Sequence, residues 1–169
     1  MRRAAVALAA AAALLLAGCA PTVTLTPAPD APSVGCADVI VGLPQTVAQA
    51  DRRNTDAQGT AAWGTPASVT LRCGVETPEV SALPCTTVDG VDWLFSDRGA
   101  DRVLTTYGRT PGVQLVTTQA VSANDALQAL SAAVADGTRA TARECLADPG
   151  SSASPGASLT PTPAPSATP

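Results

Sequence analysis

The chain has 169 residues, with 10 arginines, 14 acidic residues and neither histidine nor lysine, and its formal net charge is −4. Without those two residue types the chain cannot build Ser-His-Asp, Cys-His or Ser-Lys catalytic machinery, because each needs a base near neutral pH or an activated amine. The acidic balance argues against nucleic-acid binding, which needs clustered cations to displace condensed counterions.

Residues 1–18 have the pattern of a bacterial lipoprotein signal peptide. Arg2 and Arg3 precede an apolar run that ends at Leu16-Ala17-Gly18-Cys19. The run is shorter than the roughly 20 residues that a membrane-spanning helix needs. The pattern therefore predicts cleavage before Cys19 and acylation of that residue. We expect a chain anchored by lipid to the extracytoplasmic face of the cell membrane, with eight arginines minus fourteen carboxylates giving a charge of −6.

Two segments rich in proline, threonine, serine and alanine enclose the central part of the chain. Residues 19–35 contain the acylated cysteine and predict an extended tether that reaches up to about 50 Å, at about 3.1 Å per residue. Residues 149–169 have no charged side chain and predict a disordered tail. Residues 36–148 between them have the size of one globular domain.

Within this domain, the apolar stretch 36–43 predicts a short helix that ends before Pro44. Alternating residues predict strands over 69–75, 91–96, 102–107 and 113–118, arranged as an antiparallel meander, with a turn at 108–112. Residues 45–60 match neither pattern. A second helix begins after Ser122, which forms a capping box with Asp125, and ends at Gly137 in a left-handed conformation. The predicted class is α+β: a small antiparallel sheet of about four strands covered by one or two helices.

Four cysteines remain once Cys19 carries the lipid, and an oxidising compartment favours two disulfides among them. Spacing suits Cys73 with Cys85, closing an excursion between two strands, and Cys36 with Cys145, tying the ends of the domain together. Sequence alone allows all three connectivities. The spacing matches no zinc motif, so we expect no metal and no cofactor.

A set of short motifs along the domain resembles a known family. These motifs are Leu43-Pro44, Ala62-Trp63-Gly64, Leu71-Arg72-Cys73-Gly74, Gly90-Val91-Asp92-Trp93 and Tyr107-Gly108-Arg109, framed by Cys36, Cys85 and Cys145. Together they resemble an actinobacterial lipoprotein family whose ectodomain is catalogued as a domain of unknown function. The resemblance implies a location in the cell envelope and brings no reaction, ligand or catalytic residue.

Three side chains are candidates for ligand binding. Trp63 is predicted in a loop, where it serves either as a structural staple or as a surface contact. Arg72 and Arg109 either pair with Asp89 or Asp92, or recognise an anionic envelope ligand. The arginine pair Arg52-Arg53 is interpreted as a solvated face.

Paired carboxylates are the remaining source of chemistry. Asp89 with Asp92, and Asp97 with Asp101, offer the residue types of a glycosidase acid and base. Asp97 and Asp101 are also candidates for binding calcium. Strand ends and turns are the simpler interpretation of these aspartates, and no catalytic residue is assigned.

We therefore expect a non-enzymatic binding or assembly factor of the cell envelope, whose partner is an envelope protein or a small molecule. The alternatives are a solute-capture lipoprotein of a transporter and a carboxylate-dependent envelope hydrolase.

Overall fold

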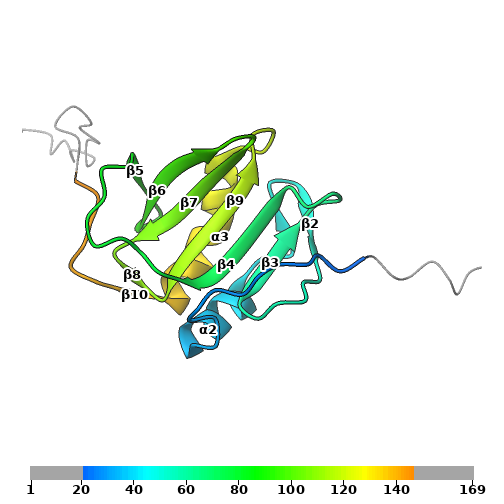
Figure 1. Ribbon diagram of the computed structural model, residues 1–169, viewed down its shortest axis with the longest axis horizontal. Coiled ribbons are helices and arrows are strands. Elements are labelled where there is room, and N and C mark those ends of the chain that lie inside the picture. The colour runs from blue at the N-terminus through cyan, green and yellow to red at the C-terminus, as the bar shows by residue number, and fades with distance from the viewer. Residues whose placement is uncertain (1–20, 147–169) are drawn as a thin grey trace, which may run out of the picture.

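A computed structural model describes residues 21–146, drawn in colour in Figure 1. The predictions for the signal peptide 1–18, for acylation of Cys19 and for the tail 149–169 lie outside the described residues. Among the residues that are described, no helix is long and apolar enough to cross a membrane.

The described chain forms an α+β domain with two helices and ten strands (Figure 1). Its elements are α2 (Val34–Gly42), β1 (Thr46–Val47), β2 (Ala50–Arg53), β3 (Thr60–Trp63), β4 (Val69–Val75), β5 (Cys85–Val88), β6 (Val91–Arg98), β7 (Asp101–Tyr107), β8 (Arg109–Thr110), β9 (Gly112–Thr118), α3 (Ala123–Gly137) and β10 (Arg139–Ala140).

The main sheet has eight strands in the order β1-β2-β3-β4-β9-β7-β6-β5, all paired with antiparallel neighbours, and β8 pairs separately with β10. The prediction of about four strands was too small, because β1 and β2 lie in the ambiguous stretch 45–60 and β3 and β5 are only four residues long. All four predicted strands exist. The predicted meander was wrong at β4, which pairs with β9 and not with β6. After β4 the chain crosses to the far edge of the sheet, where β5 lies.

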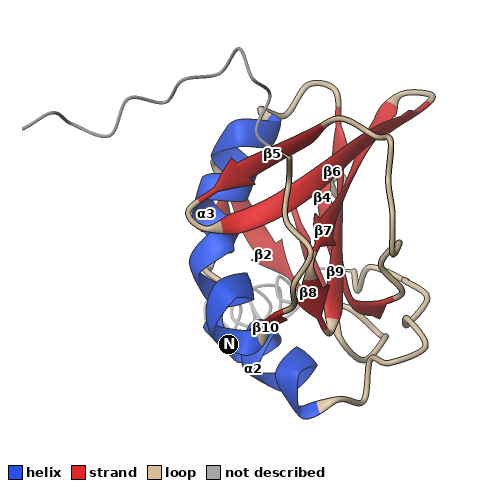
Figure 2. Ribbon diagram, turned by 90° about the vertical axis from the view of Figure 1, so that its left-hand side faces the viewer, coloured by secondary structure: helices blue, strands red, loops and turns tan. Residues whose placement is uncertain are grey.

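Both helices lie on one face of the sheet and enclose the hydrophobic core (Figure 2). The strands alternate accordingly: β4 buries Val69, Leu71 and Cys73, while Thr70 and Arg72 face the other side. Helix α3 contributes Leu127, Leu130 and Val134, all at most 1% exposed. Burial of this apolar face accounts for the position of the helix, since exposed side chains occupy its opposite side.

The two ends of α3 follow different rules. At the start, Ser122 Oγ accepts a hydrogen bond from the Asp125 N–H (3.3 Å), which confirms the predicted N-cap. At the end, Gly137 was predicted to be left-handed, and this was wrong, because it is the last helical residue and Thr138 is the extended C-cap. A Cβ at Gly137 would lie 2.5 Å from Val39 Cγ2, so glycine is required there by the close approach of α2.

Residues 21–33 pack along the domain, which corrects the predicted tether for the described part of 19–35. Val23 forms a parallel bridge with Thr55. The Asp30 N–H donates to Gly74 O (3.1 Å), and Ala31 is 3% exposed. The proline-rich composition suggested an extended free chain, but distant backbone groups supply hydrogen-bond partners that composition cannot reveal.

The disulfides join Cys36 to Cys73 and Cys85 to Cys145, so the pairing favoured from sequence was wrong. Cys36 and Cys73 are fully buried between α2 and β4. Cys85 lies on the edge strand β5, where the last described segment runs past it. The fold brings α2 to the middle of the sheet and the C-terminal segment to its edge, so the nearest sulfurs differ from those that chain spacing suggested.

Candidate functional site

A groove of about 710 Å³ lies between the start of α3 and strands β5, β6 and β7. Its apolar lining comes from Val88, Phe95, Val121 and Leu127. Its polar lining comes from Thr86, Arg102, Gln119, Ser122 and Asn124. The volume lies within the range of small-molecule sites, which combine an apolar wall with a few polar groups.

Register explains why the groove forms at this end of the sheet. Phe95 pairs with Leu104, so both point toward the helix face, and Arg102 lies on that same face two residues before Leu104. An arginine cannot be buried there without a partner. The apolar core therefore ends at Arg102, which lines the same groove as the first residues of α3.

Arg102 is the charged group of the groove. Its Nε lies 3.6 Å from Asp97 Oδ1, an ion pair beyond hydrogen-bond length, and the two side chains are 35% and 71% exposed. Such a pair contributes little to stability. The guanidinium therefore retains donors that can bind an anionic group entering the groove.

Two buried polar atoms lie on the same face of the sheet, next to the lining residues. Trp93 Nε1, two residues before Phe95, and Thr117 Oγ1, cross-strand from Arg102, have no hydrogen-bond partner among the described residues. Both side chains are fully buried. Unsatisfied polar atoms of this kind are uncommon in protein cores.

The structure places Trp63 in β3 and buries it completely, where sequence predicted a loop. Its Nε1–H donates to Pro44 O (3.2 Å). Trp63 therefore joins β3 to the segment after α2 and has no surface available for a ligand. Of the two roles considered for Trp63, the structure supports the structural staple.

Arg72 and Arg109 do not lie in the groove and do not pair with Asp89 or Asp92. Arg72 lies on the helix-free face of the sheet, cross-strand from Thr60 and Gln114. Arg109 donates to the carbonyl oxygens of Gly90 (2.7 Å) and Ala135 (3.5 Å). The guanidinium of Arg109 therefore serves to join the β5–β6 turn to α3.

Two of the four candidate carboxylates, Asp92 and Asp97, have side-chain partners, and the other two lie at a turn and at a strand end. Asp92 accepts from Thr87 Oγ1 and from the Cys145 N–H, each at 2.6 Å. Asp89 has a φ of 48° and forms the β5–β6 turn with Gly90. Asp97 pairs with Arg102, and Asp101 lies at the start of β7. Among residues 21–146 no cluster of three His, Cys, Asp or Glu side chains forms a candidate metal site.

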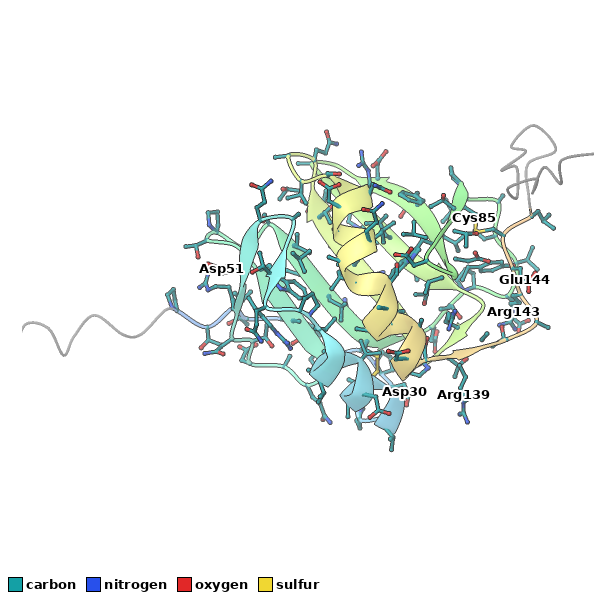
Figure 3. The ribbon with its side chains drawn as sticks, turned by 180° about the vertical axis from the view of Figure 1, so that it is seen from behind. Asp30, Asp51, Cys85, Arg139, Arg143 and Glu144 are labelled. Atoms are coloured by element: carbon teal, nitrogen blue, oxygen red, sulfur yellow. A yellow bond between two sulfur atoms is a disulfide. The ribbon has the colours of Figure 1, made fainter. Side chains whose placement is uncertain are left out.

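A separate hollow lies beside the last described residues and contains charged side chains. Asp92, Arg109, Arg143 and Glu144 line it, at a volume of about 290 Å³. Figure 3 shows Arg143 and Glu144 on the same side of the molecule as Cys85, where the last described residues run along the sheet edge. Arg143 pairs with Glu79 (3.1 Å), so contacts that hold the last described segment organise this hollow.

Sequence reasoning missed Arg102, Val88 and Val121 as lining residues. The one indication in the sequence was Arg102, which the alternation of residues in its strand places on the same face as Leu104. The strand pairing of β7 with β6 and β9 was needed to show that this face forms a groove there.

No curated protein and no solved structure matches this chain. A family model described as "Protein of unknown function (DUF3515)" matches residues 3–143. That range covers most of the chain, and the protein therefore belongs to this family.

Proposed function

We propose that this protein is a lipid-anchored binding ectodomain of the bacterial cell envelope, and that the groove beside α3 takes a small amphipathic ligand with an anionic end. The groove carries the proposal. Its apolar wall suits a hydrocarbon or aromatic body, and Arg102 suits an acidic head group.

The location rests on the sequence before the described domain. Leu16-Ala17-Gly18-Cys19 has the order of a lipoprotein cleavage and acylation site. The two disulfides agree with an oxidising compartment, where such bonds form and persist. Both features favour an extracytoplasmic domain of a bacterial lipoprotein, and the proposal of an actinobacterial source rests on the motif resemblance alone.

A binding role, without catalysis, is supported by the engagement of the acidic side chains. Both oxygens of Asp92 accept hydrogen bonds, and Asp89 is a turn residue. Glycoside hydrolysis needs a second free carboxyl across a cleft. The groove contains one cation and no carboxylate, which favours recognition over acid-base chemistry.

The test uses the full mature chain and 8-anilinonaphthalene-1-sulfonate, which has an aromatic body and an anionic group. We expect saturable binding with one site and a rise in fluorescence. Arg102→Gln should weaken binding about tenfold, since a hydrogen bond to a charged group contributes roughly 1.5–3 kcal/mol. Val121→Ser should weaken it as well.

Arg98→Gln is the matched control, because Arg98 is exposed on the same hairpin and lies outside the groove. The control should bind the dye like the parent chain. Absence of saturable binding, or equal affinities of the Arg102 and Arg98 variants, would contradict the proposal for the groove. Mass spectrometry of the N-terminal peptide tests the anchor separately: an uncleaved or unmodified Cys19 would contradict the location.

A further inference from the structure

We propose that the end of the domain formed by Pro21–Leu25 and the β2–β3 turn lies directly against the lipid bilayer, with the groove directed away from it. This inference rests on acylation of Cys19, which is part of the proposed function. The tether predicted for residues 19–35 would hold the domain away from the membrane, whereas this inference places the domain in contact with it.

Hydrogen bonds attach the segment Pro21–Leu25 to strand β2 and to the β2–β3 turn, residues 54–59. The Val23 N–H donates to Asn54 O (2.8 Å), and the Asp56 N–H donates to Val23 O (3.3 Å). The Leu25 N–H donates to Asp56 Oδ1 (2.9 Å). An Arg53 Nη2–H donates to Pro21 O. We call this set of four hydrogen bonds the N-terminal clamp.

The clamp leaves almost no free chain between domain and lipid. Pro21 is two residues after Cys19, a distance of at most about 7 Å even when the backbone is fully extended. An acylated Cys19 lies at the membrane surface because its fatty chains enter the bilayer. The β2–β3 turn, which is held to Pro21–Leu25, must therefore lie close to the lipid head groups.

The same geometry directs the groove outward. The clamp lies beside β2 and β3, near one edge of the sheet. The groove is lined by β5, β6 and β7, toward the opposite edge. Strands β3 and β6 are four positions apart, which is about 19 Å at roughly 4.8 Å per strand. Figure 1 shows the two described chain ends on opposite sides of the domain.

The apposed surface has little electrostatic attraction for lipid. Within Pro21–Leu25 and the β2–β3 turn, Thr22, Thr24, Asn54 and Gln58 are exposed and uncharged, and Asp56 is the exposed charged residue. Arg53 donates to Gly64 O and Thr65 Oγ1 as well as to Pro21 O, so both of its terminal nitrogens already have acceptors within the protein. Arg53 and Asp56 carry opposite charges, so this surface has no net charge, and the short covalent link sets the position without a need for anionic lipid.

The test uses the full mature chain, acylated at Cys19, in phosphatidylcholine vesicles with nitroxide-labelled head groups. With the remaining native cysteines in disulfides, Gln58→Cys provides a single thiol for a fluorophore, and Asn124→Cys provides the matched label at the groove. We expect most of the fluorescence at position 58 to be lost by contact quenching and that at position 124 to be retained. Adding anionic lipid should not change this difference.

A second variant tests the clamp. Arg53→Ala combined with Asp56→Ala removes two of its contacts and should reduce quenching at position 58, while the protein still floats with the vesicles. Asp51→Asn is the control, since Asp51 is exposed and lies on β2 outside the clamp. Circular dichroism and thermal unfolding check that the variants remain folded.

The two proposals fail in different ways. If the protein is acylated and floats, but the labels at 58 and 124 are quenched equally or not at all, the orientation is wrong and the anchor stands. If Cys19 is not acylated, the proposed location fails. The orientation is then measured on a chain coupled at Cys19 to a maleimide phospholipid, with the fluorophore on a non-natural residue at position 58.

Discussion

Asp92 Oδ2 lies 2.6 Å from the backbone nitrogen of Cys145, and the two residues are 53 positions apart in the chain. The other oxygen, Oδ1, accepts from Thr87 Oγ1 at the same distance. One carboxylate on β6 thus holds both the edge strand β5 and the C-terminal segment, beside the Cys85–Cys145 disulfide. This side chain therefore organises the end of the sheet that lies farthest from the N-terminal clamp.

Asp92→Ala should lower the free energy of unfolding by about 1–3 kcal/mol, because two donors lose a charged acceptor. The measurement is urea unfolding with both disulfides intact. Asp89→Asn is the matched control: asparagine tolerates the positive φ of this exposed turn, so its effect should be near zero. Equal losses in the two variants would show that the contacts of Asp92 are not what stabilises this region.

The two disulfides should differ in their resistance to reduction. Cys36 and Cys73 are fully buried, whereas Cys85 and Cys145 are partly exposed. A thiolate must reach a sulfur atom to exchange with it, so increasing concentrations of dithiothreitol should open Cys85–Cys145 first. Peptide mapping after alkylation follows each bond. Recovery of Cys73 linked to Cys85 from unreduced protein would contradict the described pairing.

Gly137→Ala should destabilise the domain although it lies in a helix. In an exposed helix, alanine is favoured over glycine by about 1 kcal/mol. Here the added Cβ would lie 2.5 Å from Val39 N as well as Val39 Cγ2, so α2 must shift away from α3. We expect a loss of about 1–3 kcal/mol in chemical unfolding, the range of overpacked sites.

Ala129→Gly measures the intrinsic difference in helix stability between alanine and glycine, because Ala129 is exposed on the same helix. It should cost about 1 kcal/mol. A stabilising effect of Gly137→Ala would show that the two helices are not in close contact at this point.

The N-terminal clamp should weaken in acid. Its hydrogen bond from the Leu25 N–H, and then one from the Thr24 side chain, hold the pKa of the Asp56 carboxyl below its ordinary value of 3.8. A carboxyl with a lowered pKa in the folded state contributes stability above its unfolded pKa and loses that contribution as the pH falls through the folded pKa. Protection of the Leu25 amide from hydrogen exchange should therefore be constant near neutral pH and decrease at pH values below 3.8.

The Asp56→Asn variant is the control for this pH dependence, because its side chain has no charge to lose. Its Leu25 amide should show lower protection near neutral pH and no decrease assigned to this site in acid. If the parent and variant amides respond identically to acid, Asp56 does not control the clamp.

Local features could be predicted from sequence where the interacting groups are close in the chain. The capping of α3 by Ser122 and Asp125 needs only three residues of spacing, and the alternation in β4, β6, β7 and β9 follows from burial of one face. The short strands β1, β2, β3 and β5 were missed, because two to four residues carry too little periodicity to be distinguished.

The candidate site was harder to predict because each of its parts depends on pairing between distant segments. Trp63 attracted attention as an aromatic in a glycine-containing stretch, yet β3 buries it against the end of α2. Arg102 went unnoticed, since its exposure in a groove depends on where α3 begins over the sheet. Amino-acid type alone could not predict that Trp63 is buried in the core and that Arg102 lines the groove.

The sequence by itself determined the α+β class, the two helices and the absence of histidine and lysine, because composition and short-range periodicity need no knowledge of distant contacts. Tertiary structure alone decided the pairing of Cys36 with Cys73, the position of β4 beside β9 and the attachment of Pro21–Leu25 to the β2–β3 turn. Each of these joins groups far apart in the chain, and such contacts depend on chain crossings and on backbone hydrogen-bond partners that residue spacing does not encode.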